Sequence, residues 1–395
     1  MTNGPQTQPL RSAVAREWAR LRADPWDMAM LTVIPLALYL FAWWLFAAGI
    51  PRDLPLVVHD LDQSVLSRSL TRMLDQSPGL RVVDAVASDA EAISLLRQRA
   101  AYGIVSLPAN LQRDIASGRS AKVQWAYNAQ FPSYTGSMTR DVRTVITTVS
   151  AGIELQARAK RGAASVQARE LFEPVRTRIT SLYNENGSYE PALALPVAFS
   201  LLHIFVMLAL VTAIGRELRM GTVPEWMASA GGSLATALGA KLLLPLLAFA
   251  AHSAVIVILF GALRGWPVEG SAVAMTLGLL FFITAYLAMG AFVAAATPSL
   301  RVALSACAFI TAPAFAFTGQ GFPLQSMPLG ARIWAESLPL THFLPLLNRT
   351  WMAGAPLRYG LADIGVLLLF TAGFGVLAYL LLARRVQQPD SWGKT

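Results

Sequence analysis

Charged residues are scarce in this chain of 395 residues, where Asp, Glu, Lys and Arg together make up 14%. A soluble domain carries about 25% charged residues. Here 55% of the residues are hydrophobic and the mean hydropathy is +0.49. Much of the chain is therefore expected to lie in lipid or in a buried interior rather than in water.

The basic residues form no Lys/Arg block and no pattern interleaved with aromatic residues, although the formal net charge is +9. Arginines lie mostly at the ends of apolar runs or are scattered through one long loop. Nucleic-acid-binding proteins gather such residues into one patch or stripe. No nucleic-acid partner is expected, and the basic excess is interpreted as a signal of membrane topology.

Catalytic and cofactor motifs are also missing from the sequence. Cys307 is the single cysteine, which excludes a disulfide framework and a paired-cysteine metal site. The GK[ST] sequence at 393–395 has Gln388 where a phosphate-binding loop requires glycine. No catalysis, metal or cofactor is therefore expected in this chain itself.

The first predicted outer strand is followed by three possible metal ligands, His59, Asp60 and Asp62. A metal site is one interpretation of this cluster. A strand-to-helix turn in which Asp62 or Ser64 caps the following helix is the favoured interpretation, because both residue types are common helix caps.

Six apolar runs are candidates for membrane spans, which need about 20 apolar residues. They cover residues 28–50, 191–214, 242–263, 271–297, 302–317 and 364–383. The first run is too long for the apolar part of a signal peptide. The predicted fold is an α-helical membrane protein with six transmembrane helices, one plus five, around an inserted extracytoplasmic α/β domain.

The inserted domain is predicted to cover residues 51–190. Strand patterns lie at 54–58, 80–86, 102–107, 122–127 and 176–183, and helix patterns lie at 64–76, 90–101, 110–117 and 133–172. Alternating strands and helices of these lengths are typical of a small α/β domain.

The distribution of Lys and Arg predicts the orientation. One side receives the N-terminal arginines with Arg216, Arg219, Lys241, Arg301, Arg384 and Arg385, and the other receives Arg264, Arg332, Arg349 and Arg358. The positive-inside rule then places segments 1–27, 215–233 and 384–395 in the cytoplasm and the 51–190 domain outside. Composition rich in Ala and Arg favours a bacterial inner membrane.

Segment 10–27 is predicted to form an amphipathic helix in the membrane interface. Its apolar face consists of Leu10, Val14, Trp18 and Leu21, and its arginines Arg11, Arg16, Arg20 and Arg22 are available to anionic headgroups. A helix that is merely solvated is the alternative.

The apolar runs contain no charged residue, and Lys241, directly before the run at 242–263, lies near a cytoplasmic end where its amine can snorkel to water. Ion-driven carriers need buried ionisable groups for their relays. His203 and His252 lie at membrane depth, where a hydrogen bond between helices is the favoured role. Any transport must therefore draw energy from elsewhere.

The polar loop 215–233 is predicted to hold a helix of about two turns. Thr222 and Glu225 have capping-box spacing, Pro224 suits the first turn, and Gly231-Gly232 ends the element. The loop would offer Trp226 and Met227 beside charged residues to a soluble partner. An ordinary cytoplasmic turn is the alternative.

Pro196, Pro245 and Pro313 lie inside the runs, where proline kinks helices and frees carbonyl groups. Segment 318–360 is apolar but too broken to span, which suggests a re-entrant or interfacial hairpin on the outer face. A surface loop resting on lipid is the alternative. The candidate exit gate consists of Pro313, Phe317, Gly319, Gly321, Phe322 and Pro323.

Four collinear segments give a resemblance to the permease subunits of ABC-2 type exporters with a large extracytoplasmic domain after the first span. They are REWARLRADP at 16–25, the strand-helix pattern at 54–83 continued at 102–118, GRELRMGTVPEWMAS at 215–229, and the outer hairpin at 317–354. The sequence departs from the family pattern at Glu185, at Gly215 before Arg-Glu, and at Pro224 before Glu225.

The resemblance implies a pair of permeases, identical or paralogous, around a substrate path, with a separate ATPase docked on each cytoplasmic loop. ATP and Mg would be bound by that ATPase, while membrane lipid and a periplasmic adaptor protein are further partners. Glu217, Gly221, Thr222 and Glu225 match the coupling motif by position. The full candidate coupling set is Arg216, Glu217, Arg219, Gly221, Thr222, Glu225 and Trp226.

Two function classes follow. The favoured hypothesis is an ATP-driven export permease with no catalysis of its own. The alternative is a membrane-anchored sensor or scaffold that binds a ligand or partner through its extracytoplasmic domain and needs no ATPase.

Overall fold

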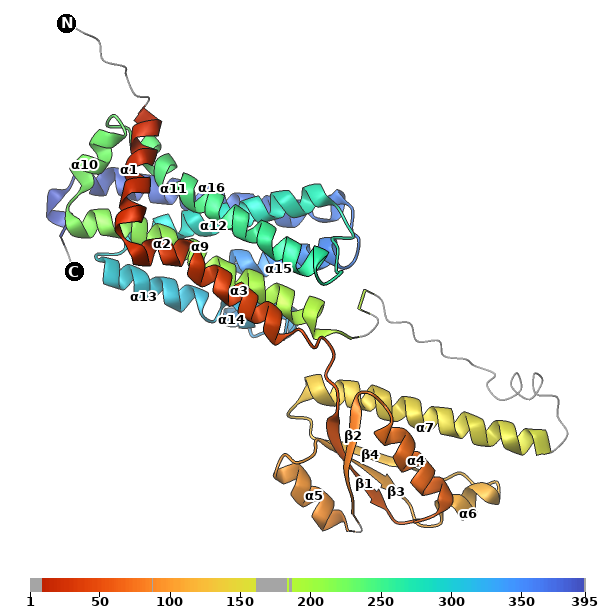
Figure 1. The fold of residues 1–395 in the computed structure, drawn as a ribbon. Helices are drawn as coiled ribbons and strands as arrows, with labels where there is room; N and C mark the ends of the chain where they lie inside the picture. Colours follow the sequence, from red (N-terminus) through yellow and green to blue (C-terminus); the bar gives the residue numbers. More distant parts are fainter. Residues whose placement is uncertain (1–8, 87, 161–182, 185–186, 394–395) are drawn as a thin grey trace, which may run out of the picture. The chain divides into compact units, whose positions relative to one another are not determined.

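The computed structural model describes residues 9–86, 88–160, 183–184 and 187–393 and divides into two units. One unit holds the helical bundle, formed by the chain up to Ala47 and from Ser188 onward, and the other holds the inserted domain between Ala48 and Gly187. Figure 1 shows the two units.

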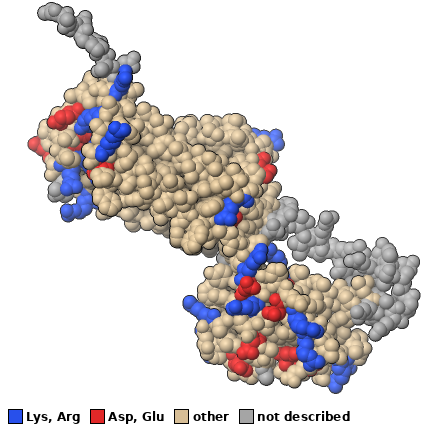
Figure 2. Space-filling model, viewed as in Figure 1, with Lys and Arg blue, Asp and Glu red and all other residues tan. Residues whose placement is uncertain are grey.

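Six helices in the described residues are long and apolar enough to cross a membrane, by length and composition. The candidate spans are Pro25–Leu45, Glu190–Met220, Leu234–Ala262, Ala272–Ala296, Leu300–Phe317 and Leu361–Arg385. The predicted one-plus-five arrangement of six helices is confirmed. On the face shown in Figure 2, charged side chains gather at the two ends of the bundle and leave its middle uncharged.

The bundle is built from helices α1 to α3 and α9 to α16. Their bounds are α1 Pro9–Ala23, α2 Pro25–Leu31, α3 Val33–Leu45, α9 Leu195–Met220, α10 Val223–Ser229, α11 Leu234–Val257, α12 Ala272–Ala296, α13 Leu300–Thr311, α14 Leu329–Glu336, α15 Pro339–Trp351 and α16 Leu361–Arg385. Short π-helical turns, Glu190–Ala194 and Ile258–Ala262, precede α9 and follow α11. α9 and α12 bury more residues than any other helix of the bundle, and α1 packs beside α10 and α11 (Figure 1).

The first span is interrupted at Thr32, between α2 and α3. Pro35 has no backbone N–H, so the carbonyl of Leu31, four residues earlier, loses its helical partner. The Nε2 atom of His252 on α11 lies 3.0 Å from that carbonyl oxygen. The interhelical hydrogen bond expected of His252 is thus found, and its acceptor is the carbonyl that a proline frees. His203 is buried in the core and packs on the ring of Tyr286 at 4.7 Å between centroids.

All three intramembrane prolines lie within the candidate spans, as expected. Pro245 lies inside α11, and Pro196 lies in the first turn of α9, which continues from the π-helical turn Glu190–Ala194. Pro313 lies between α13 and the 3-10 turn Ala314–Phe317, so the α-helix ends there.

The amphipathic N-terminal helix is shorter than expected, because α1 ends at Ala23 and the side chain of Asp24 caps α2. Glu17 and Leu21 on α1 face the bundle, whereas Leu10 and Trp18 are exposed. The predicted single apolar face is therefore wrong in part, since a buried carboxylate lies on the face that packs.

The inserted domain contains a four-stranded sheet in the order β2-β1-β3-β4. β1 Leu54–Asp60 pairs in parallel with β2 Leu80–Val86 and β3 Gly103–Leu107, and β4 Gln124–Tyr127 is antiparallel to β3. Helices α4 Val65–Asp75, α5 Asp89–Arg97, α6 Leu111–Ala116 and α7 Pro132–Lys160 complete the domain. The predicted α/β pattern is confirmed up to residue 160, and the predicted helix end at 161–172 and most of the strand at 176–183 lie outside the described residues.

The turn after β1 is a helix cap rather than a metal site. Ser64 and Ser67 form a reciprocal capping box at the start of α4. Asp60 accepts hydrogen bonds from the backbone N–H groups of Asp62 and Gln63 at 2.9 and 3.0 Å. Among the described residues, no group of three or more His, Cys, Asp or Glu side chains is placed to hold a metal ion.

Candidate functional site

The short helix α10 is attached directly to the end of α9. Gly221 has φ +69°, a backbone conformation that glycine adopts without strain. Its N–H and that of Thr222 both donate to the carbonyl of Glu217, which closes α9. Gly231 and Gly232, at φ +64° and +77°, end α10 as expected.

The predicted capping box at Thr222 is wrong. Thr222 precedes α10, but its side chain makes no cap hydrogen bond. The hydroxyl instead donates to Oε2 of Glu217 at 2.5 Å. The hydroxyl donates to this buried carboxylate one turn back instead of capping α10, because hydrogen bonds to charged groups are stronger than those between neutral groups.

Glu217 is the centre of a buried ionic network. Its side chain is 2% exposed and accepts from Arg16 Nη1 and Nη2 at 2.7 and 2.9 Å. It also accepts from Lys241 Nζ at 2.9 Å and from Thr222. The paired guanidinium contact has the fork geometry in which Arg binds carboxylates most strongly. The hydrogen bonds to Glu217 raise the pKa of Arg16 above its usual value.

Lys241 does not snorkel to water, contrary to the prediction. Its amine is fully buried and lies 2.5 Å from Glu17 Oε1 and 2.9 Å from Glu217 Oε1. It also lies 4.9 Å from the centre of the Trp226 ring. Two carboxylates and an aromatic face replace water around this cation, and the network joins α1, α9, α10 and α11.

A second set of ion pairs ties α9 to the junction of α1 and α2. Asp27 contacts Arg20 Nη1 at 2.7 Å and Arg216 Nη2 at 3.0 Å, and Arg216 also pairs with Asp24. The hydrogen bond from Arg216 lowers the pKa of Asp24 below its usual value. Arg16 and Arg20 were predicted to face lipid headgroups, but both are bonded to carboxylates within the bundle.

The candidate coupling residues differ in exposure, and Arg216, Gly221 and Thr222 are half-buried. Arg219 and Glu225 are exposed, whereas Glu217 is buried and Trp226 is 1% exposed. Trp226 was predicted to project toward a partner, but its Nε1 donates to the carbonyl of Ala237 at 3.4 Å. The exposed apolar side chain here is Met220, which is 71% exposed.

The sequence does not reveal the long-range ion pairs of α9. Arg16, which binds Glu217, and Asp24 and Asp27, which bind Arg216, lie about 200 residues from α9 in sequence. Only the Glu17–Arg20 pair, at i,i+3, is visible as a local pattern. Gly215, noted as a departure from the family pattern, allows close packing of α9 on α13, because a Cβ there would lie 2.6 Å from Leu300 Cδ1. The departure at Glu185 lies outside the described residues.

The segment 318–360, predicted as an outer hairpin, is folded against the bundle. α15 buries most of its length among the other helices, so this part is not a loop resting on lipid. Gln320 donates to the carbonyl of Ala192 at 2.9 Å and accepts from Asn348 at 3.0 Å. Of the candidate gate residues, Phe317 and Gly319 are half-buried, whereas Gly321, Phe322 and Pro323 are exposed.

The sequence matches the family model described as ABC-2 family transporter protein over residues 25–380. The chain belongs to this family. The ABC-2 chain is also similar to "Inner membrane transport permease YhhJ" of Escherichia coli (strain K12), with 23% identity over 341 residues, 85% of this chain and 87% of the relative. The protein of the same name from Shigella flexneri matches equally well. The chain is thus a transporter permease that crosses the inner membrane several times, and membership in the family implies an ATPase partner in general.

Proposed function

We propose that this ABC-2 permease exports a substrate from the cytoplasm or inner membrane, driven by a separate ATPase that docks on α10 and the end of α9. The observation that carries the proposal is the pairing of an exposed charged surface, Arg219 and Glu225, with the buried network around Glu217 directly beneath it.

The contacts support a mechanical role for α10. Trp226 anchors this helix against Lys241 and Ala237, and Thr222 anchors its start on Glu217. Force applied to α10 would therefore reach α1, α9 and α11 together, since Lys241 and Glu217 bind all of them. Rigid elements joined in this way can move as a unit when nucleotide-driven closure of the ATPase displaces α10.

The proposed orientation places α10 in the cytoplasm, together with both ends of the chain. The excess of Lys and Arg at this end of the bundle supports that orientation. The inserted domain would then lie outside, where it would meet the substrate or a periplasmic adaptor. ATP and Mg would be bound by the ATPase, and a second permease, identical or paralogous, would complete the substrate path.

The proposal is tested by reversing the exposed charges, which leaves the buried network in place. Glu225→Arg and Arg219→Glu should each reduce the vanadate-sensitive ATPase activity that co-purifies with a tagged permease by at least about tenfold, because like charges would then face each other across the interface. Asp390→Arg, an exposed carboxylate near the same end of the bundle, is the matched control.

The control should retain the ATPase. Equal retention by all three variants, with normal membrane insertion, would contradict docking at this surface.

A further inference from the structure

A pocket of 280 Å³ lies on the bundle where α2, α9, α11 and α13 meet beside the end of α1. Ligand pockets in proteins usually measure about 300–1,000 Å³, so this volume is near the lower end for a bound group. The pocket adjoins the ionic network but lies apart from Arg219 and Glu225, the surface proposed for the ATPase.

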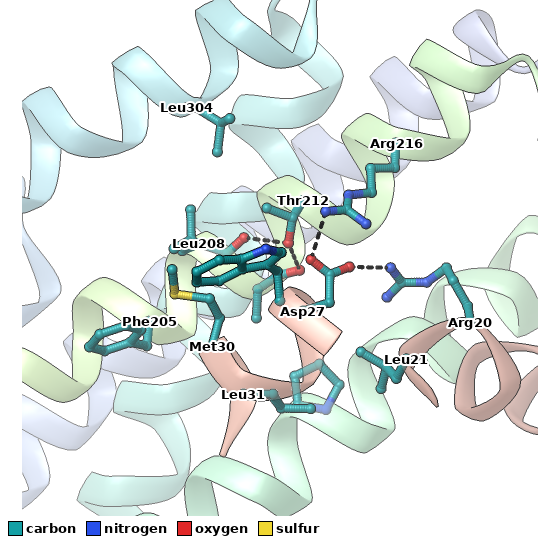
Figure 3. A pocket seen from close by; sticks show the side chains of 13 residues that line it. Arg20, Leu21, Asp27, Met30, Leu31, Phe205, Leu208, Thr212, Arg216 and Leu304 are labelled. Atoms are coloured by element: carbon teal, nitrogen blue, oxygen red, sulfur yellow. Dashed lines mark hydrogen bonds and ion pairs between the residues drawn. The ribbon is translucent and has the colours of Figure 1, made fainter. Parts of the chain in front are cut away.

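The pocket has one charged end and one apolar end. In Figure 3, Arg20 and Arg216 lie on either side of Asp27, and Phe205 and Met30 lie at the opposite end. This polarity fits an amphiphile, whose headgroup and chain need different surroundings.

One face of α9 forms the floor of the pocket. Phe205, Leu208, Thr212 and Arg216 line it and recur three or four residues apart, the spacing of neighbours on a helix surface. The eleven-residue step from Phe205 to Arg216 covers about 16 Å along the helix axis. The pocket therefore extends from the charged end of the bundle well into its apolar part.

The pocket opens to the surroundings of the bundle rather than to its core. Trp26 and Met30 on α2 line it and are 70% and 36% exposed. Because α2 begins the first candidate span, a molecule in the membrane can reach this opening from the side.

The hydrogen-bond donors at the polar end favour an anion. Asp27 already accepts a guanidinium contact on each oxygen, from Arg20 Nη1 and Arg216 Nη2. Each guanidinium carries five N–H donors and uses only part of them on Asp27 and on Glu17 or Asp24. Three carboxylates already pair with the two arginines, so an added anion is bound by the remaining N–H donors rather than by net charge, whereas an added cation meets carboxylate oxygens that are already engaged.

We propose that this pocket binds an anionic phospholipid, with its phosphate beside Arg20 and Arg216 and an acyl chain along the Phe205 side of α9. Basic pockets between transmembrane helices are suited to anionic headgroups. The orientation under the proposed function would place this lipid in the cytoplasmic leaflet. The binding itself does not rest on that orientation and requires no ATPase.

The test uses the full-length permease in mild detergent and native mass spectrometry. The probes are phosphatidylglycerol, phosphatidylcholine with the same acyl chains, and glycerol 3-phosphate as a headgroup without chains. Phosphatidylglycerol should bind at least about tenfold more tightly than phosphatidylcholine, because the latter's headgroup adds a cation beside the two arginines. Glycerol 3-phosphate should bind far more weakly than phosphatidylglycerol.

Ala209→Phe fills the pocket without touching its charges, and Leu304→Trp fills it independently from α13. Either variant that folds should lose phosphatidylglycerol binding by at least about tenfold. Ala372→Phe, at an exposed position of α16, is the matched control and should bind as the parent does.

Three results would overturn the proposal. Equal binding of both lipids would show that the arginines do not select an anion. Full competition by glycerol 3-phosphate would assign the site to a free phosphate. Equal losses in the control and the pocket variants, or no loss in the pocket variants, would show that lipid binds elsewhere on the bundle. Each result leaves ATPase docking on α10 separately testable.

Discussion

At the level of single residues, Lys241 shows how a buried cation can be stabilised inside a bundle of apolar helices. Its amine contacts Glu17 and Glu217 and faces the ring of Trp226. Removing one member of a buried ion pair leaves the partner charge without compensation, which typically costs about 3–5 kcal/mol.

Lys241→Met should therefore lower the free energy of unfolding by about 3–5 kcal/mol in SDS titrations of the purified permease. Adding Glu17→Gln should recover part of the loss, because it removes one of the two carboxylates that no longer have the amine as a partner. Arg219→Met, which removes an exposed cation from the same end, should change stability by no more than about 0.5 kcal/mol. A Lys241→Met protein as stable as its parent would mean that the network does not hold these helices together.

Asp24 gives a pH dependence with a definite sign. Hydrogen bonds from Arg216 and from backbone N–H groups lower its pKa in the folded state below the usual value of 3.8. A carboxylate with a lowered pKa stabilises the fold above its unfolded pKa, and this contribution is lost as the pH falls through the folded pKa.

The parent should be more stable than Asp24→Asn at neutral pH, and the difference should shrink as the pH falls below 3.8. Asparagine is also a good helix cap, so the comparison isolates the charge. Unfolding curves of both proteins at several pH values measure the difference. A difference that does not change with pH would contradict the ion pair with Arg216.

At the level of elements, the pairing of Pro35 with His252 joins the first span to α11. Replacing His252 by Phe leaves the carbonyl of Leu31 without its hydrogen-bond donor, which should cost about 1–3 kcal/mol. In a Pro35→Ala background the backbone N–H of residue 35 is restored, so the same substitution should cost less. Unfolding of the parent, His252→Phe, Pro35→Ala and the double variant measures the coupling between the two residues. Strictly additive losses of stability would contradict that coupling.

The positions of the helices could be predicted from the sequence, but several ends could not. The apolar run at 191–214 ends before Arg216, whereas α9 continues to Met220 because Glu217 is compensated by Arg16 and Lys241. The break at Thr32 and the turn at Asp24 have local causes instead, Pro35 and the Asp24 cap before Pro25. Apolar periodicity predicts that a span exists, whereas for α9 long-range polar contacts determine where it stops.

At the level of the whole molecule, the short helix in segment 215–233 could be predicted from the sequence, but the burial of its residues could not. Glu217 and Trp226 belong to a motif that suggests a docking surface, yet both are buried. Their burial depends on α1, which is distant from the motif in sequence, and on α11, which follows α10 and packs back against it. Only Arg219 and Glu225 retain the exposed position that docking requires.

The proposed coupling role of α10 is tested most directly by the side of the membrane on which this helix lies. The background is a Cys307→Ala chain with a single new cysteine. The test variant is Ala228→Cys on α10, and the control is Ser326→Cys in the segment 318–360; both positions are exposed. A membrane-impermeant maleimide should label Ala228→Cys only in inside-out vesicles, and less when the ATPase is co-expressed, whereas Ser326→Cys should be labelled in intact spheroplasts. Labelling of Ala228→Cys in intact spheroplasts would contradict a cytoplasmic α10 and, with it, ATPase docking on this helix.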